Sequence, residues 1–249
     1  MAGDHLQLPP VVLSQEALDR GLGVSLMEQL ATQCPETVSL LTTQYRSHEM
    51  ISGWSSQHFY SGLLSAAPSN ADISLDQLLV NTRLLTLLDR PLTWLDTRGA
   101  GAGWEEEAEG EDSLANTGEA VTTLDLVTRL LGAGLAQEHI GVISPYWAQV
   151  ATIRSLLWET EGLRGVEVRT VDGYQGREKE VIILSMVRSN NTGELGFLTE
   201  SRRINVSVTR AKRACIVIGD SQTLRQDAAC DSLWRYCQQR GGVRSVLEL

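Results

Sequence analysis

The chain has 249 residues, 42% hydrophobic and 21% charged, so it can bury a sizeable core in one or two domains. No run of about eighteen apolar residues is present and the first residues do not form a signal peptide, so no membrane segment is expected. A net charge of −10 weighs against binding to nucleic acid. However, much of the excess acid falls in residues 104–112, and residues 164–213 are rich in Arg and Lys.

The predicted elements alternate between helices and short apolar strands. In the first half of the chain we expect a helix over 25–31, a β-prone segment over 38–42, helical spacing within 44–64 and a surface excursion over 68–91. A strand over 92–96, a loop over 99–112 and an amphipathic helix over 116–131 should follow. In the second half we expect a strand over 140–146, a helix over 150–160, two strands joined by a loop within 166–187, a helix over 202–209 and a strand over 214–219.

This alternation predicts an α/β fold with a parallel sheet flanked by helices. Ligands of such sheets gather at the carboxyl ends of the strands. Polar residues stand at or soon after several predicted strand ends, and we expect them to share one rim: Tyr45, Arg46, Ser144, Tyr146, residues 172–178 and Asp220.

The cysteines are spread along the chain without any C-x-x-C pair. This spacing argues against a zinc site and against a disulfide framework, and it is typical of a reducing compartment. The four are Cys34, Cys215, Cys230 and Cys237.

Four segments hold the polar residues best suited to chemistry: residues 3–10, 44–46, 170–178 and 205–212. Taken singly, each has a structural alternative. Arg46 could pair with a carboxylate on a helix, Arg210 could lie in a solvated turn, and Asn205 could hold local backbone at a helix end. The glycines of the first and third segments could simply turn the chain.

Taken together, in this order and spacing, the segments resemble motifs III to VI of superfamily 1 helicases, in the DNA2/NAM7-like, nonsense-decay-helicase-like subgroup. "GDHLQLPP" is similar to motif III, "QYRSHE" to motif IV, "TVDGYQGREKEVIILSMVRSN" to motif V and "RRINVSVTRAK" to motif VI. The resemblance covers nearly the whole chain and is weakest over residues 68–112. It implies a RecA-like P-loop NTPase fold, with residues 1–35 a remnant of the first lobe and residues 36–249 the second lobe.

The resemblance also implies an ATP-dependent, 5′-to-3′ helicase acting on DNA or RNA in the nucleus and cytoplasm, with ATP and Mg²⁺ as cofactors. Arg46 and Arg210 would be arginine fingers at the γ-phosphate, a role that suits a bidentate, permanently charged group. Gln7 would sense that phosphate or position the attacking water. Tyr45 would stack on the adenine, Glu178 would bind the ribose, and Gly176 would allow close approach to the nucleotide.

Single-stranded DNA or RNA would cross the top of the two lobes, where hydroxyls and amides can bind the backbone without reading sequence. For Tyr146 a core position is equally open, and for Trp147 a core position is the favoured interpretation. The candidate strand contacts are Ser144, Tyr146, Gln149, Thr170, Asp172 and Gln175.

The sequence departs from the family pattern in several places. It contains no G-x-x-x-x-G-K-[ST] phosphate loop and no apolar strand that ends in Asp-Glu, so we expect the magnesium ligands on a missing first lobe and no ATP hydrolysis by this chain alone. In motif IV, Ser47 replaces the usual Met and Glu49 the usual Pro, which puts the phosphate contact of Arg46 in question. The alternatives are a non-catalytic module that binds single strands or regulates the helicase, and an inert truncated product.

Overall fold

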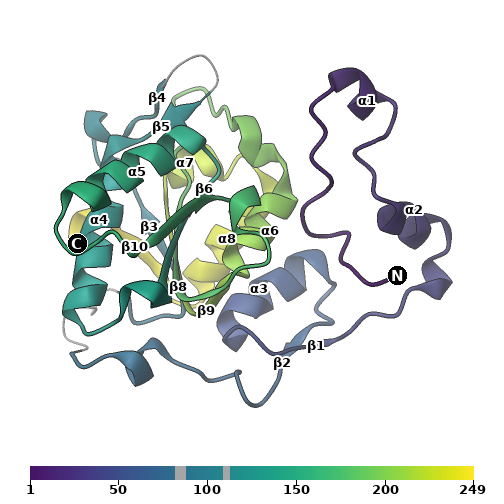
Figure 1. Cartoon of the computed structure of the whole chain (residues 1–249), viewed down its shortest axis with the longest axis horizontal. Coiled ribbons are helices and arrows are strands. Elements are labelled where there is room, and N and C mark those ends of the chain that lie inside the picture. Colours follow the sequence, from purple (N-terminus) through teal and green to yellow (C-terminus); the bar gives the residue numbers. More distant parts are fainter. Residues whose placement is uncertain (82–87, 109–112) are drawn as a thin grey trace.

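A six-stranded sheet lies at the centre of the computed structural model, which describes residues 1–81, 88–108 and 113–249 (Figure 1). The strand order is β10-β3-β9-β8-β6-β7, and every neighbouring pair is parallel. The strands are β3 (Leu92–Asp96), β6 (Ile140–Ser144), β7 (Glu167–Thr170), β8 (Lys179–Ser185), β9 (Ala211–Gly219) and β10 (Val243–Ser245). The predicted parallel α/β architecture is confirmed.

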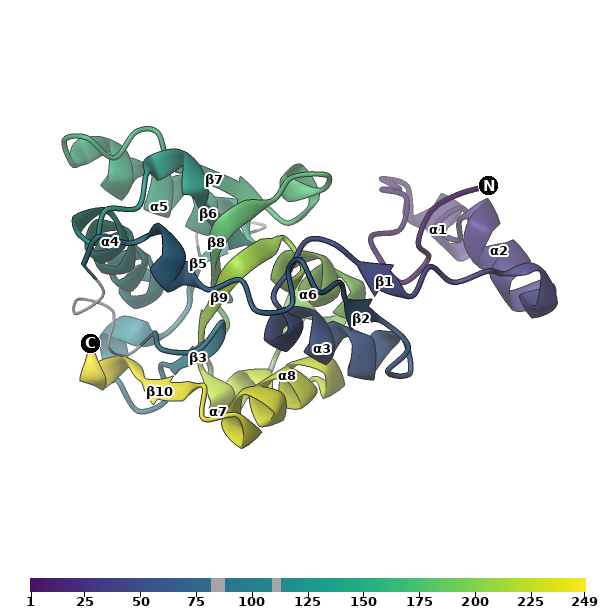
Figure 2. The same ribbon diagram turned by 90° about the horizontal axis from the view of Figure 1, so that it is seen from below.

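Helices cover both faces of the sheet (Figures 1 and 2). One face packs against α4 (Thr117–Gly132) and α5 (Trp147–Glu159), and the other against α3 (Glu49–Phe59), α6 (Ser201–Val208) and α8 (Ala228–Gln239). Because successive strand residues point to opposite faces, Ile183 joins the α4 and α5 core while Ile182 and Leu184 join the other core. This double covering explains why the strands are almost continuously apolar.

The N-terminal 42 residues lie outside the sheet, next to α3 and α6 (Figures 1 and 2). Their helices, α1 (Gln15–Asp19) and α2 (Leu26–Gln33), bury no residue, and Leu26 and Leu30 are exposed. The expected β-prone segment over 38–42 is wrong, since strand pairing begins with β1 (Thr43–Gln44), which runs parallel to β2 (Ser65–Ala66).

Several elements begin or end elsewhere than the sequence predicts. The helix expected over 150–160 begins at Trp147, and the strand expected over 214–219 begins at Ala211. That strand extends through two charged residues because Lys212 and Arg213 both pair with Glu180 on the neighbouring β8. Within the expected loop over 99–112, β4 (Glu107–Ala108) pairs with β5 (Leu114–Ala115), while residues 82–87 and 109–112 lie outside the described residues.

The remaining elements are short. Helix α7 (Ser221–Leu224) follows β9, and 3-10 turns occupy Pro35–Thr37, Leu75–Leu78, Ala102–Trp104, Gln137–His139, Asp172–Tyr174, Gly196–Thr199 and Val246–Glu248. Among the residues that the structure describes, no helix is long and apolar enough to cross a membrane.

The single rim of polar residues expected from the sequence is wrong. In a parallel sheet, residues that precede one strand and residues that follow another lie at opposite edges. Glu178 and Arg210 directly precede β8 and β9 and lie at the amino edge, whereas Ser144 and Thr170 end β6 and β7 at the carboxyl edge. The molecule therefore has two separate candidate sites.

Candidate functional site

The amino-edge site is an ion-pair cluster built around Glu178. Arg46 Nε lies 2.5 Å from Glu178 Oε2, and Lys212 Nζ lies 3.3 Å from the other carboxylate oxygen. Arg46 also donates through Nη1 to the carbonyl of Thr209 at 3.3 Å. The hydrogen bond from Arg46 is the main cause that lowers the pKa of Glu178. Glu178 is therefore ionised and holds Arg46 beside the start of β9.

Arg210 lies beside this cluster but is almost completely buried, with an exposed fraction of 3%. Its Nε donates to the carbonyl of Val206 at 3.0 Å, and its Nη2 to Gln7 Oε1 at 3.4 Å. Burial lowers the pKa of Arg210 to about 10, with the charge of Arg46 as the second cause, so the guanidinium stays protonated at neutral pH. In the described part of the chain no carboxylate lies within ion-pair distance of Arg210. A buried cation without a directly paired carboxylate favours an anion beside it, which fits a phosphate group.

Gln7 reaches Arg210 because the N-terminal segment is tied to two helices. Asp4 accepts hydrogen bonds from Gln7 Nε2 at 2.8 Å and from the hydroxyl of Tyr60 at 2.5 Å. Asn205 Nδ2, from inside α6, donates to the carbonyl of Leu6 at 2.9 Å. Asn205 is thus no helix-end amide holding local backbone: it joins segments far apart in the sequence. Motifs III and VI meet through these contacts.

The two departures within motif IV have a structural explanation. Ser47 is buried, and its hydroxyl donates to the carbonyl of Ala211 at 2.6 Å, which fixes the preceding Arg46 next to β9. His48 accepts a hydrogen bond from the Met50 amide through Nδ1 at 2.8 Å and caps α3. Glu49 lies exposed in the first turn of α3, where its charge is favourable to the helix dipole. Beside both replacements, Arg46 still contacts Glu178 and the Thr209 carbonyl.

The other predicted nucleotide contacts are open to solvent. Tyr45 is 75% exposed, so its ring can stack on a ligand. Gly176 is exposed and has a φ of +79°, a backbone conformation that residues other than glycine rarely adopt. No atom lies within 4 Å of the position that a Cβ would take there, so the conformation, not crowding in this structure, requires the glycine.

At the carboxyl edge, three predicted strand contacts are buried. Ser144 and Gln149 have no exposed surface, and Tyr146 is 3% exposed. Gln149 Nε2 donates to Ser185 Oγ at 2.9 Å, and the hydroxyl of Tyr146 to the Leu195 carbonyl at 3.3 Å. Their expected role is corrected: these side chains support the edge from inside and offer no surface to a strand.

The remaining carboxyl-edge residues are accessible. Asp172 and Gln175 are exposed and Thr170 is half-buried. Trp147 is 58% exposed, so its expected core position is wrong. A hollow at the ends of β6 and β7 brings together Trp147, Thr170 and Asp172 with Arg203 of α6. The sequence does not reveal this, because it does not show which of two adjacent aromatic residues points inward.

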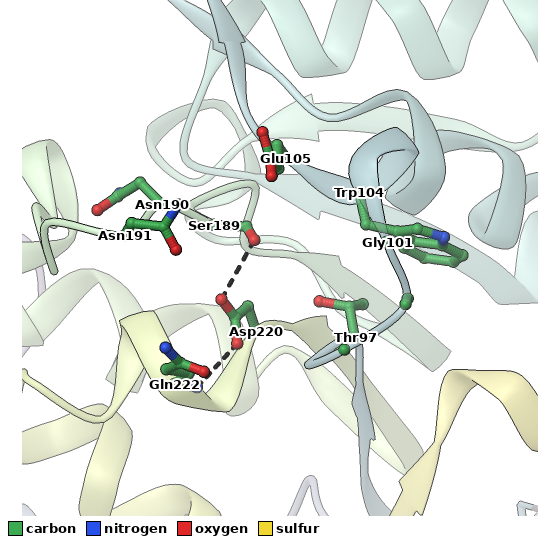
Figure 3. Close-up of a pocket in the computed structure, with 11 residues that line it drawn as sticks. Thr97, Gly101, Trp104, Glu105, Ser189, Asn190, Asn191, Asp220 and Gln222 are labelled. Atoms are coloured by element: carbon green, nitrogen blue, oxygen red, sulfur yellow. Dashed lines mark hydrogen bonds between the residues drawn. The ribbon is translucent and has the colours of Figure 1, made fainter.

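A second, polar hollow lies beyond the carboxyl ends of β3 and β9 (Figure 3). Within it, Asp220 accepts hydrogen bonds from Ser189 Oγ at 3.1 Å and from the Gln222 amide at 2.8 Å. Asp220 therefore joins the loop after β8 to α7, and it lies at the opposite edge from Arg46 rather than on a shared rim.

A buried carboxyl group that sequence reasoning missed lies behind the carboxyl edge, at the end of β8. Glu119 of α4 has no exposed surface, and its Oε2 accepts hydrogen bonds from Ser185 Oγ at 2.6 Å and the Val187 amide at 2.9 Å. Burial raises the pKa of Glu119 to about 8. The same Ser185 hydroxyl accepts from Gln149, so Glu119 braces the residues behind the carboxyl edge.

The chain forms an α/β lobe, a parallel sheet with helices on both faces, and it carries two arginines and a glutamate at the amino edge of that sheet. The chain matches the family model described as AAA domain over residues 22–222, and it belongs to that family, as the C-terminal region of a DNA2/NAM7-like superfamily 1 helicase. The resemblance predicted from the four motifs is confirmed.

Three relatives illustrate the match. The chain is 42% identical, over its whole length, to the DNA-binding protein SMUBP-2 of Rattus norvegicus. It is 42% identical over 90% of its length to the DNA polymerase alpha-associated DNA helicase A of Schizosaccharomyces pombe, and 35% identical over 96% of its length to the Regulator of nonsense transcripts 1 homolog of Drosophila melanogaster. It spans 25%, 34% and 20% of the length of these relatives.

Proposed function

We propose that this chain is the second motor lobe of an ATP-dependent helicase that moves 5′ to 3′ on single-stranded DNA or RNA, in the nucleus and cytoplasm. The observation that carries the proposal is Arg210, a buried guanidinium held by Val206 and Gln7 that forms no ion pair with a carboxylate in the described residues. Such a fixed, desolvated cation is suited to stabilising negative charge on a phosphoryl group.

Arg46 is the second finger in this proposal. Glu178 holds it at the amino edge, within reach of the same region as Arg210, whose pKa responds to the charge of Arg46. When a phosphate is present, Arg46 can share its donors between Glu178 and the phosphate oxygens, since a guanidinium has five N–H groups. Glu178 then has oxygens available to a ribose hydroxyl, and Tyr45 offers its ring to the adenine.

ATP would supply the phosphoryl group that is transferred to water. We assign the magnesium ligands to the first lobe, which would also carry the G-x-x-x-x-G-K-[ST] phosphate loop that this sequence does not contain. Residues 1–35 would belong to that first lobe and residues 36–249 to the second. Gln7, which lies in the first-lobe segment, would contact both the γ-phosphate and Arg210, so loss of the phosphate would change its contact with Arg210.

The ATPase activity of the isolated chain tests this assignment of the catalytic groups to two lobes. We expect the purified chain to hydrolyse no ATP, and the same chain joined to a first lobe with a phosphate loop to hydrolyse ATP faster when a single strand is added. Hydrolysis by the isolated chain that disappears in Arg210→Ala would contradict the proposal. Strand binding by a joined protein without any turnover would favour a non-catalytic strand-binding module.

A further inference from the structure

We propose that Trp147 is a stacking platform for one base of the bound single strand, in the hollow at the carboxyl ends of β6 and β7. This inference rests on the strand-binding part of the proposed function and names the residue that contacts a base. Trp147 is the first residue of α5, and its exposed fraction is 58%.

The fold forces Trp147 outward and holds it there. The preceding Tyr146 is 3% exposed and packs in the core formed with Ile143 and Leu198. The following Ala148 is also buried, and its amide donates to Ser113 Oγ at 3.2 Å. Because both neighbours are anchored, the indole stays in solvent. Burying its apolar surface would lower the free energy of the protein, so its exposure needs a reason.

The surroundings of the indole separate it from an ordinary exposed aromatic. It forms one wall of a hollow with a cavity volume of about 350 Å³, together with Pro145, Thr170, Asp172 and Arg203. This volume falls within the range of roughly 300–1,000 Å³ of small-ligand pockets. The lining of the hollow combines a flat aromatic surface with polar side chains, which suits a planar base attached to a sugar and a phosphate.

The polar side chains that line the hollow can hold the backbone of the same nucleotide. Arg203 Nη2 lies 3.7 Å from Asp172 Oδ2, so a positive charge borders the hollow and attracts a phosphate oxygen. The Thr170 hydroxyl, which accepts from the Gly173 amide at 3.3 Å, can still donate its proton to the sugar-phosphate backbone. Any base can stack on an indole, because every base has a flat π-face. A motor that advances along any sequence needs such a contact.

A matched control exists on the same helix. Trp158 lies near the other end of α5 and is 53% exposed, with the Arg154 guanidinium 6.0 Å from its ring. In the described part of the chain, Trp158 does not line the hollow. Trp147→Ala and Trp158→Ala each remove a similarly exposed indole, but only Trp147→Ala should weaken the binding of a base.

Fluorescence anisotropy with this chain and labelled single strands tests the inference. An oligothymidylate and an oligouridylate of equal length distinguish DNA from RNA, and an abasic strand offers the same backbone without bases. We expect Trp147→Ala to weaken binding to the base-bearing strands about tenfold, Trp147→Phe to keep most of the affinity, and Trp158→Ala to change nothing. On the abasic strand Trp147→Ala should bind like the wild type.

A spectroscopic readout excludes a purely structural role for Trp147. A strand of 2-aminopurine should lose fluorescence on binding to the wild type, and the loss should be smaller with Trp147→Ala at saturating protein. If the wild type binds the strands and Trp147→Ala binds them equally well, the stacking platform is overturned while strand binding stands. If the wild type binds no strand, strand binding itself fails, and the inference fails with it.

Discussion

Arg210 Nη2 and Gln7 Oε1 lie 3.4 Å apart, although 203 positions separate the two residues in the sequence. The contact places the N-terminal segment directly against the start of β9. It exists because Asp4 holds Gln7 from one side and Val206 orients Arg210 from the other. The N-terminal segment is thereby linked to the candidate phosphate site, which makes the attachment of that segment testable.

Removal of the Tyr60 hydroxyl should loosen the N-terminal segment. Tyr60→Phe deletes the donor to the Asp4 carboxylate, a charge-assisted hydrogen bond of 2.5 Å. We expect opening of the segment to become easier by about 1.5 kcal/mol, or roughly tenfold, measured as the rate of limited proteolysis within the first 42 residues. Tyr45→Phe is the control because its ring is 75% exposed. Equal cleavage rates for the two variants would contradict the attachment.

The Arg46–Glu178 pair predicts a pKa change at Glu178. Its carboxyl pKa is lowered mainly by the hydrogen bond from Arg46, so Arg46→Ala should raise that pKa towards the ordinary value of a glutamate. Carboxyl-carbon NMR across an acid titration measures the shift. Arg177→Ala is the matched control, since Arg177 pairs with Glu167 at 2.8 Å and should leave Glu178 unchanged. A pKa at Glu178 that is equal in all three proteins would mean that the pair does not form in solution.

Buried Glu119 should make the stability of the lobe depend on pH. Its folded pKa of about 8 lies above the ordinary value of 4.5, so its neutral form favours folding. The stabilisation is complete below pH 4.5 and disappears as the pH rises to about 8. Within this window the wild type should lose up to about 1.4 kcal/mol of unfolding free energy per pH unit relative to Glu119→Gln. Denaturant titrations at several pH values check this, and parallel pH profiles for the two proteins would show that Glu119 is ionised in the fold.

Sequence periodicity predicts the strands and helices that form the core more successfully than their ends. The short apolar strands and the helix over 116–131 follow from patterns that burial imposes directly. The start of β9 was misplaced by three residues because Lys212 and Arg213 look like loop residues until Glu180 is seen across the sheet. Helix α8 was missed, although Asp227 caps it and Ala229, Cys230, Leu233 and Cys237 form its buried stripe.

The site was predictable only where motifs were recognised. Arg46, Glu178 and Arg210 come together at the amino edge, as their shared motif resemblance implies. The carboxyl edge was predicted less well because adjacent polar residues look alike in sequence whether they face solvent or the interior. Gln149 proved to be buried and Trp147 exposed, which only the packing around α5 decides.

The most direct test of the motor lobe is strand-stimulated ATP turnover by a protein that joins this chain to a first lobe with a phosphate loop. We expect Arg210→Ala to lower turnover by about 10³-fold or more while ATP affinity and thermal unfolding change little. Arg213→Ala, three residues further along the chain within β9 and paired with Glu180 at 2.8 Å, should keep its turnover. If Arg210→Ala turns over ATP as fast as Arg213→Ala, Arg210 is no arginine finger, and a non-catalytic strand-binding lobe becomes the better account.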